Sequence, residues 1–223
     1  MGKTILTPKQ LEFLELAQSQ SQLTKRFYLT GGTALSEFYL QHRLSEDIDL
    51  FTEKEEVNQG VVEAFLKKSA RRLKIKKIKL SQFLGLFSYQ LIYQDGEELK
   101  VDFNYYPFLR IDKGIKFKNL SVDSLEDIAA NKVHTLFMKP RPRDYIDLFF
   151  LMTTQNYDLN HLILDAKAKF DWDIDRMNLA NQFIRVKELE FKDLPRMLKP
   201  LDFKKMQEFF LKLAKSLEKE IFK

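Results

Sequence analysis

The sequence predicts a protein of mixed α/β structure, with strands and helices in its first part and helices alone in its second. Short runs rich in aromatic and β-branched residues are typical of strands, and they occur at 27–29, 47–51, 84–94 and 99–105. Segments with apolar residues three and four positions apart predict helices, and they lie at 8–17, 57–73, 125–136, 159–170, 174–185 and 203–222. We therefore expect a core over 1–122 and a helical part over 123–223.

Composition restricts the classes of protein to which the chain can belong. The 223 residues are 44% hydrophobic, which is enough to fill a proper core. The absence of cysteine excludes disulfides and thiolate metal sites, and three histidines are too few for a histidine-rich zinc site. No apolar run approaches the length that spans a bilayer, and the first residues do not begin a signal peptide, so we expect a cytoplasmic protein. The net charge of +5 permits an anionic partner without requiring one.

The stretch from Phe27 to Phe51 combines a strand, a glycine turn, a helix and a second strand. Gly31 and Gly32 break the first strand, because glycine turns the backbone sharply at no steric cost. Thr33 is placed to cap a helix over 34–41. Backbone N–H groups at such a helix start suit a phosphate.

Asp47 and Asp49 stand two apart at the second strand, so their side chains share one face while Ile48 and Leu50 point to the core. Two neighbouring carboxylates repel each other, and a divalent cation such as Mg²⁺ or Mn²⁺ removes that cost. A bare Asp-x-Asp pair would be read as two solvated residues at a strand end, and the glycines as no more than a turn. Together with the glycine turn, the pair indicates the apparatus of phosphoryl transfer.

A third carboxylate, Asp102, lies between Val101 and Phe103 in a strand that returns from a hairpin turn at Asp95-Gly96. Its neighbours alternate with it, so we expect it to face away from the core and to join the Asp47/Asp49 pair from a neighbouring antiparallel strand. It would ligate the metal, or orient or deprotonate an attacking hydroxyl.

Eight cations lie between residues 67 and 79, and they have two interpretations. Cations at a helix C-terminus are stabilised by the helix dipole, and the alternation over 74–80 is that of an edge strand with a solvated basic face. The same cations could contact an RNA backbone. Both interpretations stay open.

The helix that begins near Ser124 carries Lys132 close to its apolar stripe. Such a lysine either extends its stem along the core or points at an anion. A stiff basic linker, 139–143, follows, and Asp144 and Asp147 share one face of the next helix. Acids also favour a helix start through the dipole alone.

Four of these stretches resemble a known family. GGTAL followed by HRLSEDIDLF, then KVDF, SLEDIAANKVHTLF and RDYIDLFFL, is similar to the AbiEii/AbiGii toxin family of nucleotidyltransferases, which belongs to the polymerase-β-like superfamily. The resemblance covers Phe27 to about Leu151. It implies a polymerase-β-like core, a small mixed sheet flanked by helices, with a helical C-terminal part that completes the active site.

The resemblance also implies roles for particular residues. Catalysis would fall to Asp47, Asp49, Asp102, Lys132 and Asp147, with Mg²⁺ or Mn²⁺ on the first three. Nucleotide binding would fall to Gly31, Gly32, Thr33, Lys132, Arg143 and Asp144. For Lys132 we expect a contact to the triphosphate, so that the fold itself would be indifferent to its removal.

The implied reaction is transfer of a nucleoside monophosphate from a nucleoside triphosphate to an acceptor hydroxyl, with release of pyrophosphate. The implied setting is a toxin that acts on RNA, such as the acceptor end of tRNA, and is held in check by a separately encoded antitoxin. Two alternatives are a nucleotide-binding regulator without turnover and a transferase that modifies a small molecule of the aminoglycoside type.

Overall fold

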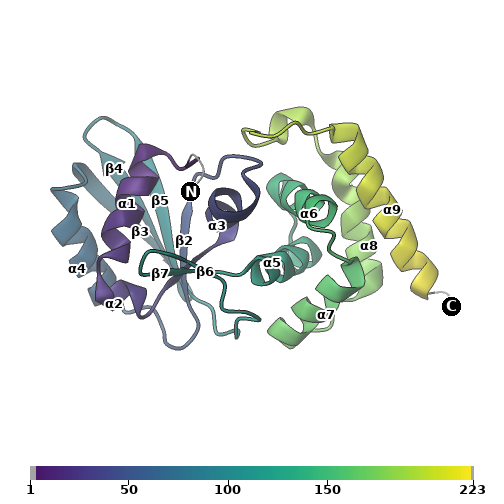
Figure 1. Ribbon diagram of the computed structural model, residues 1–223, viewed down its shortest axis with the longest axis horizontal. Coiled ribbons are helices and arrows are strands. Elements are labelled where there is room, and N and C mark those ends of the chain that lie inside the picture. The colour runs from purple at the N-terminus through teal and green to yellow at the C-terminus, as the bar shows by residue number, and fades with distance from the viewer. Residues whose placement is uncertain (1–3, 222–223) are drawn as a thin grey trace. The chain divides into compact units, whose positions relative to one another are not determined.

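The computed structural model describes residues 4–221, with side chains through residue 219 (Figure 1). It divides into two compact units. The first comprises the described residues up to Tyr39 together with Leu44–Leu125, and the second comprises Leu40–Arg43 together with the described residues from Glu126 onward. The sequence placed the division at 122/123 and did not anticipate that a four-residue segment of the first part would belong with the second.

The first unit is built on a mixed sheet, which confirms the α/β class. In the described part of the chain the sheet has seven strands, in the order β3-β4-β5-β2-β1-β7-β6. The strands are β1 (Tyr28–Thr30), β2 (Ile48–Thr52), β3 (Ile75–Phe83), β4 (Leu86–Tyr93), β5 (Glu98–Tyr105), β6 (Ile115–Phe117) and β7 (Leu120–Val122). β3 is an edge strand, as its alternation of Lys with apolar residues predicted.

The direction of β5 differs from the expectation. β5 is antiparallel to β4, its hairpin partner, but it runs parallel to β2. The reason is that β2 and β5 are joined not by a turn but by α4 (Gln59–Ala70), β3 and β4, and such a long connection allows parallel pairing. The hairpin itself turns at Gly96, whose φ is +88°, as the Asp95-Gly96 pair predicted.

One face of the sheet carries the core of this unit. Tyr89, Phe103 and Leu50 are buried there, and Tyr89 packs edge-to-face on Phe103. α1 (Pro8–Gln18) and α4 lie over this face, joined by an edge-to-face contact of Phe13 with Phe65 (Figure 1). α1 begins with the capping box predicted for Thr7 and Gln10.

The helix after β1 starts earlier than predicted. α3 is Gly31–Leu35, its N-cap is Thr30 rather than Thr33, and it continues as a π-helix over Ser36–Leu40. Thr33 does not cap because its hydroxyl donates to the carbonyl of Asp47 instead. That bond ties the helix to the approach of β2.

The second unit is helical in its described part, as predicted. Its helices are α5 (Leu125–Met138, of which Leu125 is the last residue of the first unit), α6 (Pro142–Thr154), α7 (Leu159–Phe170), α8 (Arg176–Ile184) and α9 (Phe203–Ile221). α6 begins at Pro142, two residues before the predicted start, because proline fits the first helical position. Asp175 caps α8, and its side chain accepts from the N–H of Asn178. Among the described residues, no helix combines the length and the apolar character that crossing a bilayer requires.

Candidate active site

Asp49 and Asp102 lie side by side on the first unit's sheet. They are Cα partners in the parallel pairing of β2 and β5, so both side chains stand on the same face. This is the face opposite the core, because Ile48 and Leu50 alternate with Asp49 and are fully buried. Asp47, two positions before Asp49, belongs to the same side. The predicted placement of the three acids on one face is therefore observed, although their catalytic and metal-binding roles stay predictions.

Asp102 is held by two polar partners. Ser88 Oγ donates to its Oδ1 at 2.5 Å, and Lys100 Nζ donates to its Oδ2 at 2.6 Å. Lys100 Nζ also lies 3.6 Å from Asp47 Oδ2. One ammonium group thus stands among the carboxylates and neutralises part of their mutual repulsion.

We did not predict from the sequence that Lys100 would lie among the carboxylates. The available signal was its position two residues before Asp102 on the same strand, which puts both side chains on one face. Partial burial opposes the charged form, but the hydrogen bond that Lys100 donates to Asp102 and the charges of Asp102, Asp47 and Asp49 outweigh it, so the pKa of Lys100 is raised. Lys100 therefore carries its charge at neutral pH.

The chemistry of these side chains fits a hard divalent cation. Carboxylate oxygens from Asp47, Asp49 and Asp102, with the hydroxyl of Ser88 behind them, are the donors that Mg²⁺ prefers. Within residues 4–219, however, no three acidic or histidine side chains are spaced as a ready metal centre. The cation that stands among these acids in the structure is Lys100.

Gly31 forms one wall of the site. Its φ is +73°, and a Cβ added there would lie 2.1 Å from Oδ2 of Asp49. The backbone of the turn and the carboxylate therefore approach more closely than any side chain would permit. Gly32 and Thr33 follow in the first turn of α3, where the sequence placed a phosphate.

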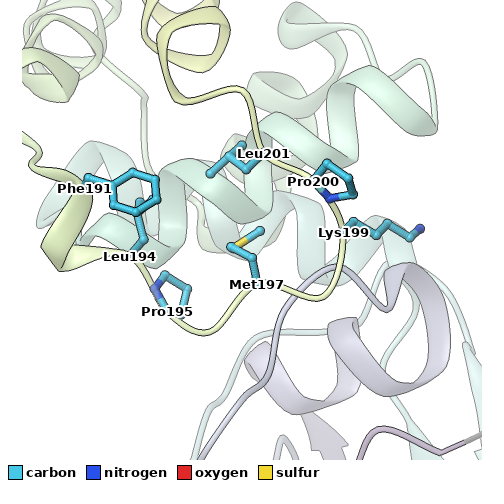
Figure 2. Close-up of a pocket in the computed structure, with 7 residues that line it drawn as sticks. All are labelled: Phe191, Leu194, Pro195, Met197, Lys199, Pro200 and Leu201. Atoms are coloured by element: carbon cyan, nitrogen blue, oxygen red, sulfur yellow. The ribbon is translucent and has the colours of Figure 1, made fainter.

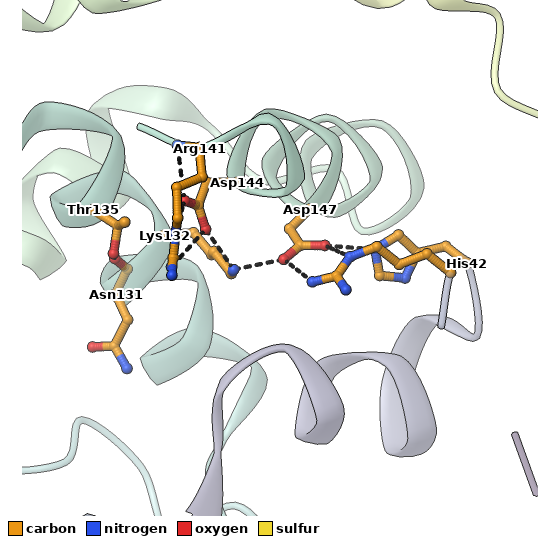
Figure 3. Close-up of polar contacts among 8 residues, drawn as sticks. His42, Asn131, Lys132, Thr135, Arg141, Asp144 and Asp147 are labelled. Atoms are coloured by element: carbon orange, nitrogen blue, oxygen red, sulfur yellow. Dashed lines mark hydrogen bonds and ion pairs between the residues drawn. The ribbon is translucent and has the colours of Figure 1, made fainter. Parts of the chain in front are cut away.

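Lys132, Asp144 and Asp147 form a buried ionic network in the second unit (Figure 3). Lys132 Nζ lies 2.8 Å from Asp144 Oδ1 and 2.6 Å from Asp147 Oδ2. Both carboxylates are fully buried, and Lys132 is 7% exposed. The expectation that only a ligand would pair with Lys132, leaving the fold indifferent to it, is therefore wrong.

His42 and Arg43 complete the network from the segment Leu40–Arg43. Arg43 clamps Asp147 with two bonds, Nε to Oδ1 at 2.6 Å and Nη2 to Oδ2 at 2.7 Å. His42 Nε2 lies 2.8 Å from the same Oδ1, whereas its Nδ1 is buried without a partner. Because Asp147 can only accept, Nε2 carries the proton of the neutral ring. The sequence contained the signal, since both residues stand in HRLSEDIDLF, but no role was derived for them.

The charges of the network set its pKa values. Burial favours the neutral form of Asp147, but Lys132 and Arg43 outweigh it and hold its pKa well below the usual range. Lys132 and Arg141 lower the pKa of Asp144 against burial in the same way. Burial lowers the pKa of His42, so its imidazole is neutral. Arg143, predicted to bind nucleotide, lies half-buried in the first turn of α6.

A separate hollow in the second unit lies along 191–201 (Figure 2). It has a volume of about 340 Å³ and is lined by Phe191, Leu194, Pro195, Met197, Lys199, Pro200 and Leu201. Apart from Lys199 these residues are apolar, so the lining contains no carboxylate and no imidazole. The same segment braces His42, whose carbonyl accepts from the N–H groups of Leu198 and Lys199 at 2.8 and 3.1 Å.

Solved structures share the fold of this chain. JHP933 from Helicobacter pylori is 18% identical with a TM-score of 0.58, covering 95% of this chain and 91% of that chain. A second H. pylori structure is also 18% identical, with a TM-score of 0.61 and 96% and 97% coverage. At this identity the likeness concerns the fold alone.

Two sequence comparisons go further. A protein of Aquifex aeolicus is 31% identical over 166 residues, which are 74% of this chain and 76% of that protein. Residues 14–219 match the family described as nucleotidyl transferase AbiEii toxin, type IV toxin–antitoxin system. The match includes both units and all four stretches that suggested the family, and the chain therefore belongs to the AbiEii nucleotidyltransferase toxin family.

Proposed function

We propose that the protein transfers a nucleoside monophosphate from a nucleoside triphosphate to an acceptor hydroxyl and releases pyrophosphate. The observation that carries this proposal is the pairing of Asp49 with Asp102 in adjacent parallel strands, with Asp47 on the same side. Membership of a nucleotidyltransferase family supports the reaction class.

The carboxylates Asp47, Asp49 and Asp102 would hold the divalent cation, Mg²⁺ or Mn²⁺. When bound, that ion would neutralise charge on the triphosphate and on the attacking oxygen. The acceptor oxygen forms a bond to the α-phosphorus while the bond to the bridging oxygen of the β-phosphate breaks, and pyrophosphate leaves. Asp102, which already accepts a bond from a hydroxyl, that of Ser88, orients the acceptor hydroxyl and takes its proton.

The turn at Gly31, Gly32 and Thr33 offers backbone N–H groups to the phosphates, next to Asp49. For Lys132, Arg143, Asp144 and Asp147 the proposed roles in nucleotide binding and catalysis rest on the family motifs in which they stand. Their network also has a structural role, since Lys132 and Arg43 compensate two fully buried carboxylates.

The acceptor we propose is RNA, with tRNA as the first candidate, in a cytoplasmic setting where a separately encoded antitoxin restrains the activity. The toxin–antitoxin description of the family supports this setting. The basic balance of the chain, +5, is compatible with a polyanionic acceptor.

The proposal is tested by incubating the protein with Mg²⁺, total RNA and each nucleoside triphosphate labelled at the α-phosphate. We expect label in RNA with one or more nucleotides, and none with Asp49→Asn. Label in a small molecule would redirect the proposal to a different acceptor. Nucleotide binding without transfer of label by the wild type would contradict enzyme activity and favour a regulator.

A further inference from the structure

The first unit carries a stretch of the chain in which all charged residues are cations. Residues 64–94 contain no aspartate or glutamate. The same stretch contains eight cations, which we call the basic patch: Lys67, Lys68, Arg71, Arg72, Lys74, Lys76, Lys77 and Lys79. The helix dipole accounts for cations in the last turn of α4 only, so it leaves those on the strand unexplained.

The structure places the basic patch on the rim of the sheet. It occupies the last turn of α4, the turn over 71–74 and the first half of edge strand β3, and all eight side chains are exposed. Lys67 pairs with Glu63 at 3.2 Å. Within residues 4–219, the other seven make no ion pair. Their charge is therefore not compensated by the protein.

Strand register connects this rim to the carboxylates. Ser81 of β3 pairs with Ser88 of β4, Ser88 pairs with Asp102 of β5, and Asp102 pairs with Asp49 of β2. Cross-strand partners share a face, so this row crosses the sheet on the side of the candidate active site. With strands spaced about 4.8 Å apart, β3 lies about 14 Å from β2.

Lys77, Lys79 and Phe83 extend the row along β3. They stand at even intervals from Ser81, so their side chains lie on the same face as Asp102 and Asp49. Phe83 is 73% exposed at the hairpin tip. An exposed aromatic ring on the same strand face as lysines is a combination with which proteins hold single-stranded nucleic acid, by stacking bases and pairing phosphates.

We propose that the basic patch and Phe83 bind single-stranded RNA and lead its end across the sheet to Asp102 and Asp49. The inference rests on the proposed nucleotidyl transfer and names the surface that holds its acceptor. RNA is favoured over an acidic protein partner because Lys77, Lys79 and Phe83 share the face of the carboxylates. A protein that only inhibits the activity could bind elsewhere and would not require cations on the same sheet face as Asp102 and Asp49.

The test measures binding of a polyuridine oligonucleotide as a function of salt, without nucleoside triphosphate. Lys77→Gln/Lys79→Gln should weaken binding and reduce the slope of log K against log salt by about 1.4, since each phosphate contact contributes about 0.7 on single strands. Phe83→Ala should weaken binding roughly 5- to 150-fold at unchanged slope, because stacking releases no counterions. Lys204→Gln/Lys205→Gln, on exposed lysines of α9, is the matched control and should bind as the wild type does.

The five substituted side chains are all exposed, so the variants should fold as the wild type does, and melting temperatures check that they do. Wild-type affinity and slope in the Lys77/Lys79 variant would overturn the proposal. So would variants that bind RNA normally but no longer bind a co-expressed antitoxin. Because the assay needs no transfer, RNA binding at the patch by a protein inactive in labelling would contradict only the proposed reaction.

Discussion

At the scale of single residues, Lys132 shows how a motif residue can be structural as well as functional. Its ammonium group is paired with Asp144 and Asp147, two carboxylates with no solvent exposure. We expect Lys132→Met to lower the free energy of unfolding by about 3 kcal/mol, the lower end for breaking a buried pair, because Arg43 and Arg141 still compensate the acids. Urea unfolding measures this loss.

The control for Lys132 is Lys204→Met, an exposed lysine on α9 that should be neutral. Asp144→Asn combined with Lys132→Met should cost less than the sum of the two single changes, because they share one interaction. Strict additivity, or a Lys132→Met protein as stable as wild type, would contradict the network. Transfer activity measured where both proteins are folded then tests the separate triphosphate role.

At Gly31 the limits on substitution are the backbone conformation and the space available, not charge. A Cβ at this position would overlap the carboxylate of Asp49, and the positive φ adds about 1–2 kcal/mol of strain for any other residue. We expect Gly31→Ala to destabilise the protein and to abolish transfer by displacing Asp49. Gly60→Ala, in the first turn of α4, is the matched control: its Cβ would lie 3.4 Å from Asn58 Oδ1, and alanine should be tolerated there. Equal effects at both glycines, measured by thermal unfolding, would contradict this account.

At the scale of elements, strands and helices were predictable where the pattern was local. The alternation of Asp49 with Ile48 and Leu50 gave the correct face of β2, and Asp95-Gly96 gave the hairpin. The parallel pairing of β2 with β5 was not predictable, because it depends on a connection through α4, β3 and β4 rather than on either strand.

Local reasoning failed in the same way at the candidate site. Asp47, Asp49 and Asp102 could be proposed from spacing, since side-chain alternation fixes their face. The partners of Asp147 could not, because His42 and Arg43 lie 105 and 104 positions away in the chain. The early start of α3 follows from a competing bond of Thr33 to the Asp47 carbonyl, which no propensity reveals.

The contact between α6 and the segment Leu40–Arg43 predicts a pH dependence. Burial lowers the folded pKa of His42 below the unfolded value of about 6.5, so its stability contribution is complete above that pH and is lost as pH falls through the folded pKa. The loss reaches at most about 1.4 kcal/mol per pH unit for one proton. His134 is stacked on Phe170, and burial lowers its pKa as well, so it adds to the loss of stability at low pH with the same sign.

His42→Gln keeps a donor for Asp147 but does not titrate. We expect its free energy of unfolding to fall less steeply than that of wild type between about pH 7 and about pH 5. Asp144 and Asp147 do not interfere, because their lowered pKa values confine their effect to more acidic solution. Denaturant titrations across this range provide the measurement, and parallel curves for the two proteins would show that His42 does not titrate with unfolding.

At the scale of the whole molecule, the two units treat their acids differently. In the second, Lys132, Arg43 and Arg141 compensate the buried aspartates, so the protein itself satisfies them. In the first, Lys100 neutralises Asp47 and Asp102 only in part, and its side chain is 38% exposed. A partly neutralised, partly open acidic group is the one that gains most from an added divalent cation.

A metal that binds only the folded protein stabilises it through mass action, by about 2.7 kcal/mol at one hundred times its dissociation constant. For a chain of this length that corresponds to a rise in melting temperature of roughly 5–10 °C. We expect Mg²⁺ or Mn²⁺ to produce such a rise in wild type, and Asp49→Asn to abolish it.

Lys100→Met should have the opposite effect. Without metal its melting temperature should be lower than that of wild type, because the carboxylates repel each other. With metal its melting temperature should rise by more than that of wild type, because the ammonium group and the metal compete for the same oxygens. Lys116→Met, an exposed lysine of β6, should behave as wild type. Equal rises in wild type and in both the Asp49 and Lys100 variants would place the metal elsewhere on the protein.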